Sequence, residues 1–281
     1  MKSKYLVLAK PGIILGNIIT TAGGFALASR GHFNWALFLE TLLGLSFIIA
    51  SACVFNNYID RVADQKMQRT KHRPLATGSI SDYSAILFGA ALAVLGTITL
   101  AYFTNALTVA VALFGFFVYV VIYSLSKQKT VHATLIGSFA GAAPPIVGYT
   151  AVTNHLDGGA FLLYAVLVLW QMPHFYAIAM YRSNDYAAAS TPVLPLVSGN
   201  HIAKIHMLLY IVAFFIPVSL LTYYGYTGYA YLAVSALVGL IWLKISFEGF
   251  KAENDAVWAR QMFRFSLVVI TLFSAMIAID L

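Results

Sequence analysis

The chain has 281 residues, of which 60% are hydrophobic and only 10% are charged. Soluble domains carry about 25% charged residues, so this composition excludes an ordinary soluble globule. The 17 lysines and arginines exceed the ten acidic residues by seven, a balance that would also suit a nucleic-acid-binding protein. The single cysteine, Cys53, excludes an intrachain disulfide.

Apolar windows predict an all-α, polytopic membrane protein with nine transmembrane helices. The expected spans are 11–29, 35–56, 83–103, 106–125, 131–152, 160–180, 204–224, 226–247 and 262–280. The first resembles a signal peptide, but it is long enough to cross the bilayer and starts at Lys10-Pro11, as a helix does. Long charged connections follow the second and sixth spans, which predicts two four-helix halves plus a ninth helix. We expect residues 1–281 to form one integral membrane domain.

Basic residues are distributed unequally between the two sides of this arrangement, and only Arg30 lies apart from the others. The sixteen on the other side are Lys2, Lys4, Lys10, Arg61, Lys66, Arg69, Lys71, Arg73, Lys127, Lys129, Arg182, Lys204, Lys244, Lys251, Arg260 and Arg264. Because basic loops are retained in the cytoplasm, we expect the amino terminus and the charged connections there, and the carboxyl terminus opposite. The excess of positive charge is then explained by the orientation of the chain in the lipid bilayer, and no nucleic-acid partner is expected.

The strongest polar signal follows the second span. Asn56, Asp60 and Asp64 are four residues apart and therefore share one face of a helix. Amide and carboxylate oxygens are the ligands that Mg²⁺ prefers. The alternative is a solvated helix end with local ion pairs to Arg61 or Lys66.

Three cations a few residues further on favour the metal site. Arg69, Lys71 and Arg73 follow in the next connection, where arginine forks and a lysine charge suit phosphate oxygens. Carboxylates beside such a cluster favour a metal-bridged polyanion over a bare cation.

These residues resemble a known family motif. The pattern Asn56-Asn57-x-x-Asp60-x-x-x-Asp64, followed by Arg69-Thr70-x-x-Arg73-Pro74-Leu75, is similar to the first aspartate-rich motif of the UbiA superfamily of intramembrane prenyltransferases. Asn57 stands where many members carry another aspartate, which leaves one acidic ligand fewer.

Two later segments narrow the resemblance, which runs from Lys10 to Arg260. Ser138–Gly148 (SFAGAAPPIVG) and Trp170–Phe175 (WQMPHF) resemble signatures of the branch that farnesylates protoheme IX. The resemblance implies transfer of the farnesyl group of farnesyl diphosphate to the vinyl group of heme B, with addition of water, giving heme O and diphosphate. It also implies Mg²⁺ as cofactor, with heme B as a substrate.

The resemblance further implies a second half-site at the end of the sixth span. Many members carry two aspartates four residues apart there, where this chain has Tyr181 and Asp185. We therefore expect Asp185 to join the metal ligands Asn56, Asp60 and Asp64. Without the resemblance, Asp185 beside Arg182 would be a surface ion pair of little energy.

A charge balance predicts which residues bind the diphosphate. Three aspartates, a diphosphate and two Mg²⁺ ions leave an excess of negative charge. The residues expected to offset it are Arg69, Lys71, Arg73, Lys127, Lys129 and Arg182. For Lys127 and Lys129, anchoring of a helix end is an equal alternative.

His174 follows Pro173 inside the sixth span. Ionisable groups within membrane helices usually face the bundle interior. Since it belongs to the heme-farnesylating signature, we expect it to contact heme or to transfer a proton, and so to act with Asp60, Asp64 and Asp185 in catalysis. The alternative is a hydrogen-bonded core histidine.

Two other functions remain open from the sequence. One is a superfamily prenyltransferase that acts on a quinone precursor or another aromatic lipid. The other is a transporter or channel, since polar residues inside the membrane also mark ion pathways; the position of the polar cluster at one end of the spans disfavours it. Oligomeric state leaves no signal in the sequence.

Overall fold

The computed structural model describes residues 4–280, so Lys2 lies outside the described part of the chain. All regular structure in this part is helical. The elements are α1 (Lys4–Ala9), α2 (Pro11–Ser29), α3 (Trp35–Lys66), α4 (Asp82–Phe103), α5 (Ala106–Phe117), the π-helical η1 (Val118–Tyr123), α6 (Ser124–Ser126), α7 (Ala133–Gly141), α8 (Ala143–Thr153), α9 (Gly158–Tyr181), α10 (Ser183–Ala188), α11 (Leu194–Tyr223), α12 (Tyr229–Glu248), the 3₁₀ turn η2 (Gly249–Lys251) and α13 (Asp255–Ile279).

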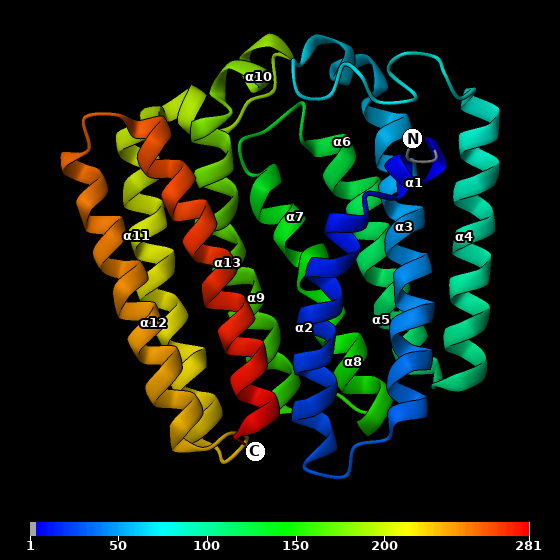
Figure 1. The fold of residues 1–281 in the computed structure, drawn as a ribbon, viewed down its shortest axis with the longest axis vertical. Coiled ribbons are helices and arrows are strands. Elements are labelled where there is room, and N and C mark those ends of the chain that lie inside the picture. Colours follow the sequence, from blue (N-terminus) through cyan, green and yellow to red (C-terminus); the bar gives the residue numbers. More distant parts are fainter. Residues whose placement is uncertain (1–3, 281) are drawn as a thin grey trace.

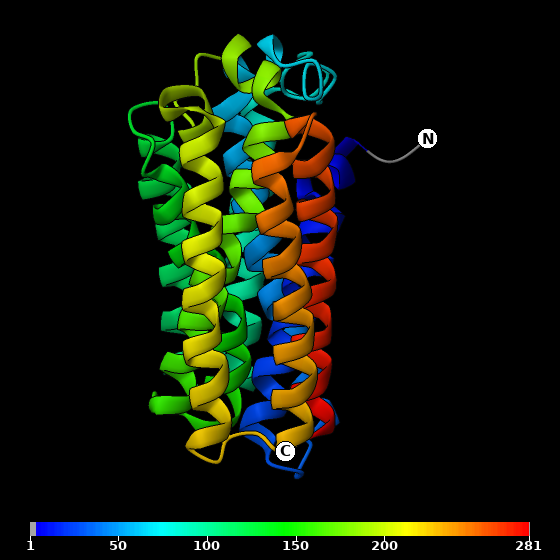
Figure 2. The same cartoon turned by 90° about the vertical axis from the view of Figure 1, so that its left-hand side faces the viewer.

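Nine helical spans in the described residues are long and apolar enough to cross a membrane, which confirms the predicted architecture. They run side by side, with α1 and the last turn of α13 at opposite ends (Figure 1). An odd number of spans requires this placement. The end that carries α10 is called the α10 end; the connection between α3 and α4 lies at the same end in both views (Figures 1 and 2).

Three spans begin or end more than one turn from the expectation, including the ninth, which was expected to begin at residue 262 but begins at Asp255. The second was expected to end at residue 56, but α3 continues to Lys66 and has 32 residues. At 1.5 Å per residue it is about 48 Å long, whereas the hydrocarbon core is about 30 Å thick. The polar end of α3 therefore extends beyond the membrane core. Similarly, α11 begins at Leu194, with a kink at Gly199 (φ 84°), because hydropathy detects only its apolar part.

The fifth span is broken into α7 and α8 and packs directly on α2. Pro144 lies in the first turn of α8, where its missing N–H removes no helical hydrogen bond. A Cβ on Gly148 would overlap the carbonyl of Thr21, and one on Gly24 would overlap the carbonyl of Pro145. Glycine thus lets the two backbones touch, as small residues do between membrane helices.

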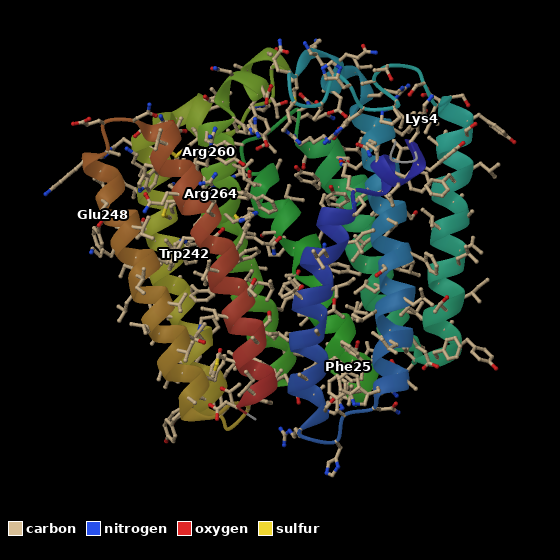
Figure 3. All side chains as sticks on the ribbon, viewed as in Figure 1. Lys4, Phe25, Trp242, Glu248, Arg260 and Arg264 are labelled. Atoms are coloured by element: carbon tan, nitrogen blue, oxygen red, sulfur yellow. The ribbon has the colours of Figure 1, made fainter. Side chains whose placement is uncertain are left out.

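The two halves of the bundle meet around an internal cavity. The first half comprises α2 to α5, and the second comprises α7 to α12. The last helix, α13, packs against α2, α9 and α12 and so joins the halves. Beside it, α11 and α12 form an apolar layer that includes Trp242, which is fully buried (Figure 3).

Candidate active site

A cavity of about 980 Å³ lies between the two halves of the bundle. Its walls come from α2, α3, α5, α7, α8, α9 and α13, whereas α4, α11 and α12 lie outside it. At the α10 end the lining is polar and charged. Further in, side chains such as Leu45, Val147 and Leu167 make the walls apolar. The cavity therefore suits a molecule with a charged head and an apolar body.

The predicted ligands on α3 line this polar mouth, and each aspartate is paired with a cation. Lys127, which follows α6, forms an ion pair with Asp60. Arg73 donates from Nη1 to both carboxylate oxygens of Asp64, at 3.0 and 2.8 Å. The four-residue spacing does place both carboxylates on the cavity face of α3. The end of α3, the connection that follows it and the residue after α6 are thereby joined at the mouth.

Asn56, one turn deeper, also contacts a cation. Lys10 donates from Nζ to the Asn56 Oδ1 atom at 2.8 Å. Burial of the ammonium lowers the pKa of Lys10 to about 8. Lys10 has left-handed backbone dihedrals (φ 52°), a strained conformation for a lysine that often marks a functional position. It caps the start of α2 directly before Pro11, which orients the side chain toward α3.

The donor set on α3 fits a hard divalent cation. It consists of two carboxylates and one amide oxygen on one helix face, the oxygen chemistry that Mg²⁺ requires. Among residues 4–280, no three histidine, cysteine or acidic side chains are already gathered around one point. The set is therefore incomplete without further oxygen atoms, such as those of a phosphate.

Asp185 lies apart from these ligands in the structure. It is half-buried on α10 and does not line the cavity, although its neighbour Tyr186 does. Burial raises the pKa of Tyr186, and the charge of Arg69 acts in the opposite direction. The segment after α9 and the segment after α3 thus approach each other at the mouth.

The predicted diphosphate cations divide into two groups. Four of them line the cavity: Arg69, Arg73, Lys127 and Arg182. Lys71 and Lys129 lie close in sequence but do not line it, and Lys129 is exposed. The local backbone geometry determines which of these cations line the cavity, and their closeness in sequence alone could not predict it.

His174 lies on the cavity wall in the middle of α9 and is only 9% exposed. Its Nδ1 atom is 2.7 Å from the Ser266 hydroxyl on α13. The Ser266 hydroxyl donates its single hydrogen to the Phe263 carbonyl, at 2.7 Å. It must therefore accept from Nδ1, so Nδ1 carries the proton and Nε2 has a free lone pair. Nε2 makes no hydrogen bond with any described residue.

Aromatic side chains fix the orientation of this imidazole. The indole of Trp170 stacks on it, with centroids 4.9 Å apart, and the Phe263 ring lies 4.9 Å away. Trp170 also donates from Nε1 to the Ser266 carbonyl at 2.8 Å, which ties α9 to α13. With its faces covered and Nδ1 engaged, the histidine can bind a ligand only through Nε2.

Two residues of the cavity lining, Lys10 and Gln171, and one buried residue behind it, Ser266, were not predicted as functional. Lys10 and Ser266 contact predicted residues, and Gln171 donates to the carbonyls of Ser138 and Leu167 at 3.1 and 3.0 Å. Lys10 could have been found as a charged residue directly before a helix-starting proline. Ser266 has no sequence signal, because it approaches His174 only through the packing of α13 on α9.

Together, the nine spans and this cavity define a helical intramembrane enzyme with a polar, cation-rich mouth and an apolar interior. The UbiA prenyltransferase family matches residues 17–268. The chain belongs to this family.

Relatives with curated names are similar over the full length. The protoheme IX farnesyltransferase of Protochlamydia amoebophila (strain UWE25) is 54% identical over all 281 residues, which cover 99% of that protein. The protoheme IX farnesyltransferase of Serratia proteamaculans (strain 568) is 52% identical, with 100% of this chain and 95% of that protein covered.

Solved structures share the fold at low sequence identity. A digeranylgeranylglyceryl phosphate synthase superposes with a TM-score of 0.80 at 17% identity, over 98% of this chain and 96% of that one. A UbiA homologue from Archaeoglobus fulgidus bound to DMAPP and Mg²⁺ superposes with a TM-score of 0.72 at 17% identity, over 95% of this chain and 99% of that one.

Proposed function

We propose that this protein transfers the farnesyl group of farnesyl diphosphate to the vinyl group of heme B, with addition of water, giving heme O and diphosphate. The observation that carries the proposal is a single cavity with two kinds of site. Its mouth holds carboxylates and cations, and its wall holds a histidine with a free Nε2 atom. The full-length similarity to protoheme IX farnesyltransferases supports the same substrates.

The mouth binds the diphosphate. Asn56, Asp60 and Asp64 line the mouth and would hold Mg²⁺, which neutralises charge on a leaving diphosphate. Asp185, predicted as a further ligand, does not line the cavity and is not assigned to the metal. The UbiA homologue from Archaeoglobus fulgidus, which shares this fold, was solved with DMAPP and Mg²⁺ bound, and this supports a prenyl diphosphate and Mg²⁺ as ligands of the fold.

The cations at the mouth would bind the phosphate oxygens of the diphosphate. Arg73 and Lys127 contact Asp64 and Asp60 in the structure, and Arg69 lines the same space. When metal and substrate bind, these side chains have phosphate oxygens within reach as new partners. Lys71 and Lys129 add positive charge nearby without lining the cavity. Such preorganised charge stabilises the developing anion in the transition state.

The farnesyl transfer takes place in the apolar interior of the cavity. The bond between farnesyl C1 and oxygen breaks, and its electron pair leaves with the diphosphate. The terminal vinyl carbon forms the new bond to C1, which leaves a cation on the carbon next to the porphyrin. A water oxygen adds there and loses one proton. Apolar walls keep other water away from these cations until the bond has formed.

His174 holds the heme in this scheme. Its Nε2 lone pair is available to the heme iron, since Ser266 accepts the Nδ1 proton. Imidazole nitrogen is a common iron ligand. The heme is bound reversibly through this contact, as a substrate must be.

We place the α10 end in the cytoplasm. Among the described residues, every lysine and arginine except Arg30 lies in the half of the molecule that carries α10. The positive-inside rule then puts the mouth of the cavity, and so the diphosphate, on the cytoplasmic side.

The acceptor is tested with purified protein, Mg²⁺ and farnesyl diphosphate. Parallel incubations receive heme B or a hydroxybenzoate quinone precursor, and prenylated products are measured by mass spectrometry. The proposal predicts a farnesylated heme and no prenylated hydroxybenzoate. A prenylated hydroxybenzoate without heme product would assign the protein to the other acceptor class.

A further inference from the structure

Two arginines, one directly after α9 and one on α13, flank Tyr181 at the mouth of the cavity. The guanidinium carbon of Arg182 lies 5.2 Å from the centre of the Tyr181 ring, and that of Arg260 lies 5.6 Å from it. Arg182 follows α9, whereas Arg260 belongs to α13. Neither has a carboxylate within ion-pair distance among residues 4–280. The pair therefore offers two guanidinium groups without an anion.

Tyr181 and Arg182 line the cavity at its mouth, above His174. Arg260 does not line the cavity: it is exposed beside Tyr181, at a separate recess formed with residues of α12 and α13. Tyr181 is seven residues beyond His174 on α9, about 10 Å along the helix axis. Phe263 connects the two levels, because its ring is 4.9 Å from the His174 ring and 5.7 Å from the Tyr181 ring. Arg260 lies one turn from Phe263 toward the α10 end, in the upper half of α13 in Figure 3.

The diphosphate has its own cations on a different wall. Lys10, Arg73 and Lys127 contact the ligands on α3, whereas no described contact joins Arg182 or Arg260 to α3. Planar guanidinium groups match carboxylates through paired hydrogen bonds. A ligand with two carboxylates at the level of Tyr181 and an iron atom at the level of His174 would therefore pair with both guanidinium groups and with the histidine.

Heme has this shape, and on the basis of the proposed function we infer that Arg182 and Arg260 bind its two propionate carboxylates. Both propionates lie on one edge of the porphyrin, at a distance from the iron comparable to the rise from His174 to Tyr181. The charged edge then stays at the mouth, so no carboxylate is transferred into the apolar interior, where it would be strongly disfavoured. The opposite, vinyl-bearing edge points into the cavity that holds the farnesyl chain. Arg182, predicted with the diphosphate cations, is thereby assigned to the heme.

Heme affinity measured by absorbance titration tests this inference. We expect Arg260→Ala and Arg182→Ala each to weaken heme binding by about tenfold, the effect of losing one charged hydrogen-bonded pair. Arg260→Lys keeps the charge and should lose less. The control Arg264→Ala removes a basic residue one turn further along α13 that has no contact with Tyr181, and it should bind heme like the wild type.

Heme dimethyl ester, in which both propionates are uncharged, gives the decisive comparison. The wild type should bind the ester more weakly than heme, and the alanine variants should bind it as the wild type does. Variants that lose heme and ester binding equally, or that bind heme normally, would overturn the inference. So would a loss of activity that anionic phospholipid restores while heme affinity is unchanged, because the arginines would then bind lipid headgroups. The proposed function fails separately, if the wild type binds heme without farnesylating it.

Discussion

Arg73 holds both carboxylate oxygens of Asp64, at 3.0 and 2.8 Å, although it lies beyond the end of α3 in the following connection. The Thr70 hydroxyl strengthens this fold-back by donating to the Asp64 carbonyl at 3.1 Å. The aspartate-rich motif and the basic motif are therefore one folded unit. Since Arg73 is already at the mouth, diphosphate binding needs only an exchange of its partner from the Asp64 carboxylate to phosphate oxygens.

Removal of either carboxylate should abolish most of the activity. We expect Asp60→Asn and Asp64→Asn each to lower kcat at least about a hundredfold at saturating Mg²⁺, the scale of losing a preorganised electrostatic group. Asn57→Ala is the matched control. Asn57 is buried, faces away from the cavity and donates to the Leu8 carbonyl at 2.9 Å, so its loss should affect stability more than kcat. Near-normal turnover in either aspartate variant would remove it from the metal site.

Ser266 should act through His174. In Ser266→Ala the Nδ1 proton has no acceptor, so the Nε2 lone pair is no longer held in one orientation. We expect a severalfold loss of heme affinity and a changed absorbance spectrum of the bound heme, with Ser266→Thr retaining the wild-type spectrum. A merely structural role would lower thermal stability without altering the spectrum. His174→Ala with an unchanged spectrum, affinity and turnover would leave this histidine as a core residue.

Labelling of introduced cysteines tests the sidedness. The native Cys53 is 1% exposed and should not react. His32 and Lys129 are exposed at opposite ends of the bundle. An impermeant thiol reagent should label Lys129→Cys only from the cytoplasm and His32→Cys only from outside. The reverse pattern would invert the proposed orientation of the cavity mouth.

Asp157 should stabilise the start of α9 in a pH-dependent way. Burial alone would raise its pKa, but hydrogen bonds from the Tyr149 hydroxyl and the Ala160 N–H hold the pKa of Asp157 below its ordinary value. A lowered native pKa means that the stabilisation is present above the pKa of the unfolded chain and is lost as the pH falls through the native one. Asp157→Ala should therefore lower the unfolding free energy by about 1 kcal/mol at neutral pH.

Thermal unfolding in detergent measures this difference. The Tm gap between the wild type and Asp157→Ala should narrow as the pH falls below about 4, where the unfolded carboxyl becomes protonated. Asp157→Asn, which keeps a capping oxygen, should lie between them. A gap that is the same at every pH would contradict an ionised cap.

The sequence predicts the spans well because a bilayer imposes a length and a composition that hydropathy detects. It also predicts that Asn56, Asp60 and Asp64 share one face of α3, because helical periodicity alone places them there. It does not predict the contacts between segments. Three such contacts depend on how helices distant in sequence pack: Lys10 with Asn56, Ser266 with His174, and Arg260 with Tyr181. The periodicity of a single sequence indicates local structure only and does not indicate this packing.

We expect heme B to gain a farnesyl group and one molecule of water in this cavity. The most direct measurement is the intact mass of heme extracted after purified protein has been incubated with heme B, farnesyl diphosphate and Mg²⁺ in ¹⁸O-labelled water. We predict a heme heavier by one farnesyl group and one labelled hydroxyl, and at least about a hundredfold less of this product from Asp60→Asn in the same time. Recovery of unmodified heme from an active preparation that consumes farnesyl diphosphate with another acceptor would contradict this expectation.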